Sequence, residues 1–510
     1  MQIYSFEPYG YEGSLVSVEV DLRSGVSATD VVGISDSDVK EFRETVKAAV
    51  LDCGFDYPEN RVVISLSPAD LRKYGPRHMF AGALAVLAQS NEVIRGRDDR
   101  VMVVGDTDKN GIAFGSRGMT AALESAAAIG IRYAIVPEVA QIEKISGLAL
   151  IKVRNLREAY EALLSLDKYE VYEKPKTTEA EVPEITFAEE TNNLDDMSDD
   201  TPGARDFKYA MMIAAAGRLN MIAIGSPGCG KTRMLQCLPE ITPDLLPDEA
   251  PSTERIYSIA GFSKPRIRPF RMPHQTASIE GMLGGGTNCH PGEVSIAHNG
   301  ALFLDEAAEF KSSVLQMLRV PLETGTVTLS RAGRSTTYPA RFQLLMATNP
   351  CPCGNYGSKD KICLCSLRSI SLYWQKFSLP LLDRMDIRFA FSNTAIAAPS
   401  DFDSSSAGIR EKVKKAWETQ FRRQGKLNRE LTMDEVAQIL HSPDSITNDA
   451  ITLLDREGTR YGFGVRARAS ITKIARTIAD IRGLDRIDSD CIRIGVELRK
   501  IANNIPPEFN

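Results

Sequence analysis

A glycine-rich segment carries the clearest chemistry in this 510-residue sequence. Residues 225–232 read Gly-Ser-Pro-Gly-Cys-Gly-Lys-Thr, which fits the G-x-x-x-x-G-K-[ST] pattern of a phosphate-binding loop. An apolar strand is predicted before the loop and a helix after it, so backbone N–H groups can converge on phosphate oxygens. Lys231 would reach the β- and γ-phosphates, and Thr232 would ligate Mg²⁺. The predicted nucleotide-binding residues are Gly225, Ser226, Pro227, Gly228, Cys229, Gly230, Lys231 and Thr232.

Two carboxylates end a second apolar strand. Residues 301–304 are Ala-Leu-Phe-Leu, and Asp305 and Glu306 follow them. A buried strand would place Asp305 beside the phosphates, where it can hold the Mg²⁺ shell, while Glu306 can orient and deprotonate an attacking water. Asn349 ends a third apolar strand and could position the same water against the γ-phosphate. The plainer role for Asn349 is to cap a helix.

Four cysteines lie close together directly after Asn349. Cys351, Cys353, Cys363 and Cys365 could satisfy a tetrahedral zinc ion. The C-x-C spacing is less specific than C-x₂-C, so free buried thiols or a redox pair remain as alternatives. The chain has nine cysteines and no predicted export signal, which argues against a disulfide framework.

Composition indicates a soluble globular protein. Hydrophobic residues make up 43% and charged residues 25%, and no apolar run approaches the length of a membrane span. We therefore expect a cytoplasmic protein without membrane contact. The net charge is −6, but residues 168–200 alone carry 11 acidic and 3 basic residues, which leaves +2 for the rest. Global charge therefore excludes no partner.

Strand and helix patterns predict an α/β protein of three domains. Residues 1–165 read as an α/β domain, and residues 166–204 as an acidic flexible linker, with an ordered acidic face as the alternative. Residues 205–400 alternate strands with helices, which indicates a parallel sheet. Residues 401–510 read as helical.

The order of phosphate-binding loop, Asp-Glu strand and strand-terminal Asn resembles AAA+ ATPases. Residues 268–277 and 292–306 are more specifically similar to the magnesium-chelatase-type branch, and within it to the YifB/ComM family. That family combines a Lon-protease-like N-terminal domain, an AAA+ core and a helical C-terminal domain. The resemblance covers nearly the whole chain except the acidic segment.

The resemblance assigns further residues. Arg384, in Leu-Leu-Asp-Arg-Met-Asp (381–386), matches the arginine finger that enters a neighbouring subunit's site, although Ser-Leu-Pro precedes it here where the family has Ser-Gly-Pro. Arg466 matches the sensor-2 arginine that contacts nucleotide, with Arg468 as an alternative. The Lon nucleophile position reads Gly-Pro-Arg-His (75–78) without a serine, and the base position falls near Thr120, so no acyl-enzyme can form. We expect no protease activity.

Residues 325–338 read as a β-hairpin in which Arg331 and Arg334 flank the turn. In the resembling branch this hairpin points into the pore of a hexameric ring, where two arginines could contact DNA phosphates. The alternative is a solvated turn. The resemblance thus implies an ATP- and Mg²⁺-dependent homo-oligomer, a hexamer, that acts on branched or single-stranded DNA as a branch-migration helicase in recombination or natural transformation.

A second function class is the motor subunit of a chelatase, which remodels a partner protein, and a third is a nucleotide-dependent scaffold. The Lon-like domain favours the DNA motor, because chelatase motor subunits begin at the ATPase core. A complete set of Glu306, Asn349 and Arg384 argues against the scaffold.

Overall fold

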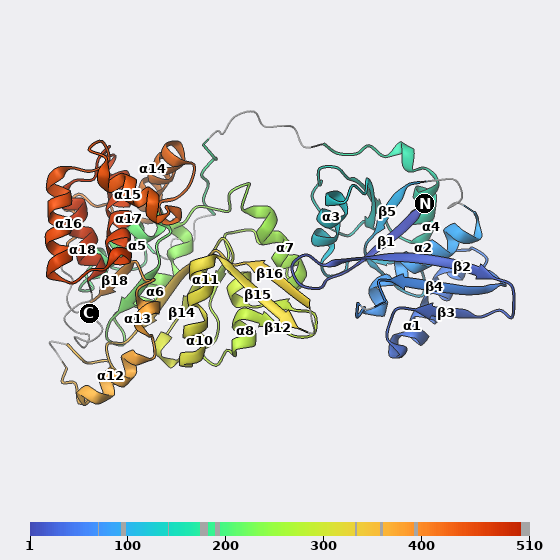
Figure 1. The fold of residues 1–510 in the computed structure, drawn as a ribbon, viewed down its shortest axis with the longest axis horizontal. Helices are drawn as coiled ribbons and strands as arrows, with labels where there is room; N and C mark the ends of the chain where they lie inside the picture. Colours follow the sequence, from blue (N-terminus) through green and yellow to red (C-terminus); the bar gives the residue numbers. More distant parts are fainter. Residues whose placement is uncertain are drawn as a thin grey trace.

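The computed structural model describes residues 1–69, 71–92, 98–140, 142–173, 182–188, 194–331, 334–357, 361–391 and 396–500. Figure 1 shows an elongated molecule with an N-terminal sheet at one end and a bundle of C-terminal helices at the other. A second sheet lies between them. Within the described residues, no helix is both long and apolar enough to cross a membrane.

The N-terminal body is a seven-stranded mixed sheet in the order β3-β4-β2-β1-β5-β8-β9. Its strands are β1 (Gln2–Glu7), β2 (Ser14–Arg23), β3 (Thr29–Val32), β4 (Arg61–Ser67), β5 (Arg100–Val103), β8 (Tyr133–Pro137) and β9 (Ala149–Val153). Helices α1 (Asp36–Asp52), α2 (Met79–Ser90) and α4 (Leu156–Leu164) pack on one face, and α3 (Met119–Ala128) packs on the other. The short elements are η1 (Gly75–His78), β6 (Asp106–Thr107), β7 (Ala113–Phe114) and η2 (Leu166–Lys168).

The central body is a five-stranded sheet in the order β11-β14-β17-β10-β18, and all its pairs are parallel. Its strands are β10 (Met221–Ile224), β11 (Phe270–Arg271), β14 (Ala301–Leu304), β17 (Gln343–Thr348) and β18 (Ile387–Ala390). Every residue of β10, β14 and β17 is buried, as expected for strands covered on both faces. The predicted parallel-sheet core is confirmed.

Helices cover both faces of this sheet, and one face is shared with the C-terminal helices. The helices of the central body are α5 (Ala204–Gly217), α6 (Lys231–Gln236), η3 (Leu238–Ile241), α7 (Ala250–Ala260), α8 (Ile279–Leu283), α9 (Glu293–Ile296), η4 (Ala307–Glu309), α10 (Ser312–Met317), α11 (Arg319–Thr324), α12 (Leu367–Gln375) and α13 (Leu379–Leu382). Two strand pairs extend from it, namely β12 (Gly284–Gly285) with β13 (His290–Pro291), and β15 (Thr326–Arg331) with β16 (Arg334–Pro339).

The C-terminal region is helical, as predicted. It comprises α14 (Ser406–Gln424), η5 (Asn428–Glu430), α15 (Met433–His441), α16 (Asn448–Arg460), α17 (Val465–Arg482) and α18 (Ser489–Arg499). The indole N–H of the buried Trp417 donates to the carbonyl of Ala215 at 3.1 Å, which ties α14 to α5. This contact joins the helices to the sheet through one continuous core.

Two described parts of the predicted acidic linker, residues 182–188 and 194–203, pack against the central body. Ile185 and Leu194 are buried in the core of the central body. The Asp195 carboxylate accepts a hydrogen bond from the backbone N–H of Ser406 at 2.6 Å, and Asp199 lies 2.8 Å from the ammonium of Lys208. Sparse apolar residues and specific acid partners therefore order residues 182–188 and 194–203, which charge counting alone overlooks.

Candidate functional site

The glycine-rich loop connects β10 to α6, as its spacing predicts. Gly228 and Gly230 adopt φ angles of 86° and 87°, a left-handed conformation that favours glycine. The Lys231 ammonium donates to the carbonyl of Ser226 at 3.2 Å and to Oδ1 of Asn349 at 3.0 Å. Burial lowers the pKa of Lys231, against the charges of Cys229, Asp305 and Glu306, which raise it. The third predicted strand thus delivers Asn349 directly to the loop lysine.

The two predicted magnesium ligands also meet. The hydroxyl of Thr232 donates to Oδ1 of Asp305 at 2.8 Å. A hydroxyl and a carboxylate are hard oxygen donors of the kind Mg²⁺ prefers, so these residues fit the ion. The pairing follows from the sheet order, since β14 and β10 both flank β17.

Glu306 projects from a strained backbone. Its φ of 47° is left-handed, a conformation that costs a non-glycine residue about 1–3 kcal/mol and recurs at functional sites. The exposed carboxylate accepts a hydrogen bond at 2.6 Å from the side-chain amide of Gln275. Sequence reasoning missed Gln275, and the only signal for it was its place in the loop after β11.

Arg384 lies beside the amino ends of the strands, whereas the phosphate-binding loop lies beside their carboxyl ends. Its carbonyl accepts a hydrogen bond at 2.8 Å from the side chain of Asn220, which precedes the amino end of β10. The phosphate-binding loop follows the carboxyl end of the same strand, so the strand's length, about 13 Å at roughly 3.3 Å per residue, separates the two. The Arg384 guanidinium pairs with Glu323 and donates to the carbonyl of Pro380 at 2.7 Å.

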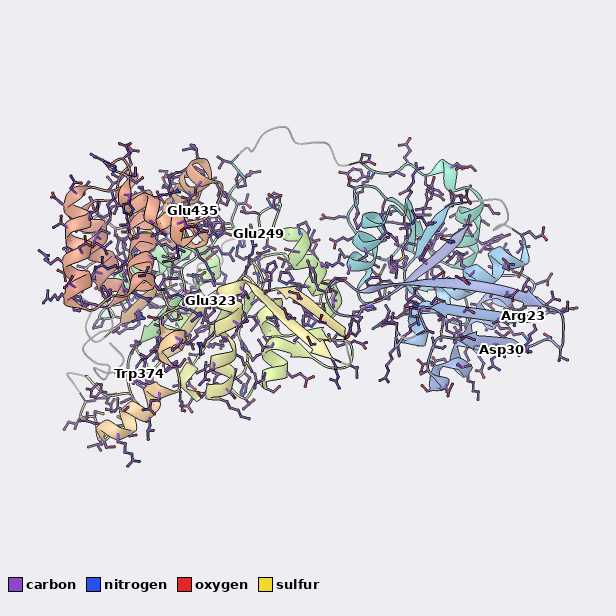
Figure 2. The ribbon with its side chains drawn as sticks, viewed as in Figure 1. Arg23, Asp30, Glu249, Glu323, Trp374 and Glu435 are labelled. Carbon is purple, nitrogen blue, oxygen red and sulfur yellow. The ribbon has the colours of Figure 1, made fainter. Side chains whose placement is uncertain are left out.

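Arg466 shares the partner of Arg384. Its guanidinium lies 3.6 Å from the Glu323 carboxylate. Glu323 lies on α11, at the base of the β15–β16 strand pair (Figure 2). Arg466 therefore stands with Arg384, away from the phosphate-binding loop of its own chain. The alternative, Arg468, pairs with Asp455 at 2.5 Å.

The four cysteines converge. Their sulfur atoms all lie within 4.8 Å of one another, and Cys351 is 3.4 Å from Cys353 and 3.7 Å from Cys363. Zinc–sulfur bonds of about 2.3 Å in a tetrahedron place the sulfurs about 3.8 Å apart, so the cluster fits zinc. Gly354, the residue after Cys353, packs on the nucleotide loop, since a Cβ there would lie 2.4 Å from Cδ of Pro227.

The predicted arginine hairpin is confirmed as a structure. Its strands β15 and β16 are antiparallel, and Arg331 pairs with Arg334 in the register nearest the tip. The Arg331 side chain is exposed. The turn at residues 332–333 and the Arg334 side chain lie outside the described part of the chain.

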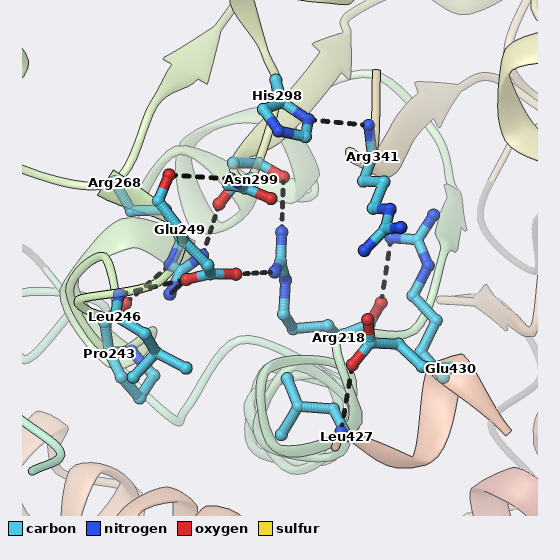
Figure 3. Close-up of polar contacts among 12 residues, drawn as sticks. Arg218, Pro243, Leu246, Glu249, Arg268, His298, Asn299, Arg341, Leu427 and Glu430 are labelled. Carbon is cyan, nitrogen blue, oxygen red and sulfur yellow. Dashed lines mark hydrogen bonds and ion pairs between the residues drawn. The ribbon is translucent and has the colours of Figure 1, made fainter. Parts of the chain in front are cut away.

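Arg268, two residues before β11, is buried and turns inward rather than toward a ligand. Arg268 and Arg218 both pair with Glu249, at 2.7 and 2.8 Å (Figure 3). Burial raises the pKa of Glu249, but the two arginines outweigh it and lower that pKa to about 2. The Asn299 side chain donates to the Glu249 carbonyl at 3.1 Å, just before β14. This cluster fixes α7 against the strand that ends in Asp305.

Residues 75–78, which resemble the Lon nucleophile loop, pack against strand β1. His78 is fully buried and hydrogen-bonds Ser5 at 2.9 Å and Glu7 at 3.2 Å. Burial lowers the pKa of His78. Arg77, which follows the Gly75-Pro76 pair, forms an ion pair with Glu7 at 2.6 Å.

Comparisons with known proteins agree over nearly the whole length. The family model described as "Magnesium chelatase, subunit ChlI" matches residues 196–398, "Subunit ChlI of Mg-chelatase" matches 18–140, and "Magnesium chelatase, subunit ChlI C-terminal" matches 403–499. The chain is 34% identical over 508 residues to the uncharacterized protein YifB of Escherichia coli (strain K12), covering 96% of this chain and 95% of the relative. The chain belongs to the YifB/ComM family.

Other family members are similarly close. The competence protein ComM of Haemophilus influenzae is 34% identical over 506 residues, covering 95% of this chain and 94% of the relative. An uncharacterized protein of Mycobacterium bovis is 34% identical over 419 residues, 80% of each chain. As a YifB/ComM protein the chain is a magnesium-chelatase-type AAA+ ATPase, a class that uses ATP and Mg²⁺.

Proposed function

We propose that this protein is a ring-forming, ATP-driven motor that acts on DNA in the cytoplasm as a branch-migration helicase. The observation that supports a ring is that the residues predicted to hydrolyse ATP lie at opposite ends of the strands of one sheet. Lys231, Asp305, Glu306 and Asn349 gather at the carboxyl ends of the strands, whereas Arg384 lies at the amino ends. One chain alone cannot bring these groups together, but a head-to-tail neighbour can, and repetition closes a ring. We propose a hexamer.

Each predicted site residue has a separate role in ATP hydrolysis. Backbone N–H groups of Gly225–Thr232 and the Lys231 ammonium hold the phosphates, and Thr232 and Asp305 would hold Mg²⁺, which neutralises phosphate charge. Glu306 takes the proton of the attacking water, and Asn349 orients that water from its position beside Lys231. Arg384 and Arg466 of a neighbouring subunit would stabilise charge on the transferred group, which couples hydrolysis to assembly.

DNA is the proposed substrate for two reasons. A relative that is 34% identical carries the name competence protein, and the β15–β16 hairpin presents Arg331 at its exposed end. Arginines at a hairpin tip contact phosphates without reading sequence.

Protease activity is not part of the proposal, because the 75–78 segment offers no nucleophile. The alternative is a chelatase-type motor that remodels a partner protein, which the names of the matching family models favour.

Strand displacement on a three-stranded branched DNA tests the motor. We expect ATP-dependent displacement by the wild type and none by Glu306→Gln, which keeps nucleotide binding but lacks the base. ATP hydrolysis that no DNA stimulates, from a protein that binds no DNA, would contradict the DNA motor and favour the protein-remodelling alternative.

We further propose that Cys351, Cys353, Cys363 and Cys365 hold a structural zinc ion that supports the nucleotide loop through Gly354. Metal analysis of the purified protein should find one zinc per chain. Cys363→Ser should lose it, whereas Cys53→Ser, which removes a buried thiol in the N-terminal body, should retain it. Equal zinc content in both variants would contradict the site.

A further inference from the structure

The β15–β16 hairpin does not stand free on the central body. The turn between β1 and β2 of the N-terminal body, residues 8–13, lies against strand β16. The hydroxyl of the buried Thr336 accepts a hydrogen bond from the backbone N–H of Tyr11 at 2.8 Å and donates one to the Glu12 carboxylate at 2.6 Å. Gly10 is so close that a Cβ there would lie 2.4 Å from the Thr336 side chain.

Aromatic packing continues the same contact. The rings of Tyr11 and Tyr338 meet edge to face with centroids 5.7 Å apart, and Tyr338 is fully buried. The Tyr338 hydroxyl donates to the carbonyl of Cys289 at 2.9 Å, while Cys289 itself donates weakly to the Tyr9 hydroxyl at 3.6 Å. The backbone N–H of Gly10 also donates to the carbonyl of Asn288 at 3.0 Å. One turn therefore holds both the hairpin and the β12–β13 insertion beside it.

Arg255 of α7 anchors this turn from behind. Its guanidinium donates to the carbonyls of Tyr11 at 2.9 Å and Glu12 at 3.0 Å and pairs with Glu124 of α3 at 2.7 Å. The same guanidinium lies over the Tyr11 ring, 5.1 Å from its centroid. Four polar partners, with the Ser125 hydroxyl as the fourth, and a ring on one largely buried arginine leave the turn little freedom to move independently of α7.

The two bodies also share an apolar core. Ile256 and Ile259 of α7 and Tyr338 of β16 are buried in one cluster with Met119 and Leu123 of α3. Side chains from both bodies thus exclude water together, so separating them would expose apolar surface at a cost of about 25 cal/mol per Å². Figure 1 shows where α3 and α7 approach one another.

We propose that residues 8–13 are a clamp that positions the β15–β16 hairpin, so that the N-terminal body and the hairpin move as one unit. Thr336 is its central positioning residue, because its single hydroxyl bonds two successive residues of the turn. This assigns the N-terminal body, which lacks protease chemistry, the task of aiming the hairpin arginines. Only that last consequence, for DNA, rests on the proposed function.

Hydrogen exchange on the full-length protein tests the clamp through a pair of matched threonines. Thr336→Val removes both hydrogen bonds, whereas Thr337→Val alters the next residue, which is exposed on the other face of the hairpin and whose hydroxyl hydrogen-bonds Thr328. We expect the amides of 334–338 to exchange at least about tenfold faster in Thr336→Val, and within about twofold of wild type in Thr337→Val. Thr336→Ser, which retains the hydroxyl, should restore protection. Unchanged exchange in Thr336→Val would overturn the clamp.

A glycine pair keeps the test decisive if a threonine variant unfolds. Gly10 and Gly147 both have left-handed φ angles, 62° and 85°, but nothing lies within 4 Å of a Cβ on Gly147. Gly10→Ala should loosen the hairpin, and Gly147→Ala, which has comparable backbone strain, should not. Equal effects of the two variants would overturn the clamp.

DNA binding separates the clamp from the proposed function. With a single-stranded oligonucleotide, Thr336→Val should bind more weakly than Thr337→Val, because an unaimed hairpin loses phosphate contacts. Equal DNA affinity of these two variants would overturn the positioning role. A wild-type protein that binds no DNA would contradict the proposed function, while the exchange result would still decide the clamp.

Discussion

Replacing Glu249 by glutamine should destabilise the central body in a pH-dependent way. The Glu249 carboxylate accepts hydrogen bonds from both Arg218 and Arg268, and Asn299 binds the same residue's carbonyl (Figure 3). Burial raises the Glu249 pKa, but the two arginines outweigh it and lower that pKa from 4.5 to about 2. Each pKa unit corresponds to about 1.4 kcal/mol, so ionised Glu249 contributes about 3 kcal/mol to the free energy of unfolding at pH 7.

The sign follows from the lowered pKa. The contribution of Glu249 to the free energy of unfolding is complete above its unfolded pKa of about 4.5. It falls to about half by pH 3 and vanishes as the pH passes below about 2. Glu249→Gln also leaves two buried guanidinium groups without their counter-charge. We therefore expect a thermal midpoint lower by about 6 °C at pH 7, at roughly 2 °C per kcal/mol, and a smaller gap to wild type at pH 3.

Tryptophan fluorescence reports this transition selectively. The chain has two tryptophans, Trp374 on α12 and Trp417 on α14, and both lie outside the N-terminal body. Glu411→Gln is the matched control, because that carboxylate pairs with Lys415 in full solvent on the same helix as Trp417. It should leave the midpoint unchanged. A gap between Glu249→Gln and wild type that is equally large at pH 7 and pH 3 would refute the charge argument.

The remaining predictions concern the motor. Lys231→Ala should abolish ATP binding by calorimetry, because it removes the phosphate-facing ammonium, and retained affinity would contradict the loop assignment. Arg384→Ala should bind ATP normally but hydrolyse it at least about 100-fold more slowly. Mixing Arg384→Ala with Glu306→Gln should restore some turnover at shared interfaces, and no rescue would argue against action in trans. The double variant Arg331→Ala with Arg334→Ala should lower the salt slope of DNA binding by about 1.4–1.8, since each lost phosphate contact removes roughly 0.7–0.9, and an unchanged slope would refute hairpin contact.

Local patterns sufficed for much of the fold and of the nucleotide site. The phosphate-binding loop, the Asp305–Glu306 strand end and the arginine hairpin all depend on neighbouring residues, so periodicity and spacing predict them. Residues 182–188 and 194–203 show where composition misleads, because Ile185 and Leu194 pack on the core and Asp195 and Asp199 find specific partners. The only local signal for Gln275 was its place in the loop after β11, because its contact with Glu306 joins positions 31 residues apart.

The sequence by itself determined which reactive groups the chain carries: the lysine and threonine proposed for phosphate and Mg²⁺, the carboxylates proposed for water, and the thiols proposed for zinc. Only the tertiary structure decided which groups act together. Parallel strand order brings Asn349 to Lys231 and sends Arg384 to the far edge of the sheet. The tertiary structure also places the β1–β2 turn against Thr336, which follows Tyr11 by 325 residues. Such contacts depend on how buried surfaces fit across the chain, and spacing along the sequence carries no record of that fit.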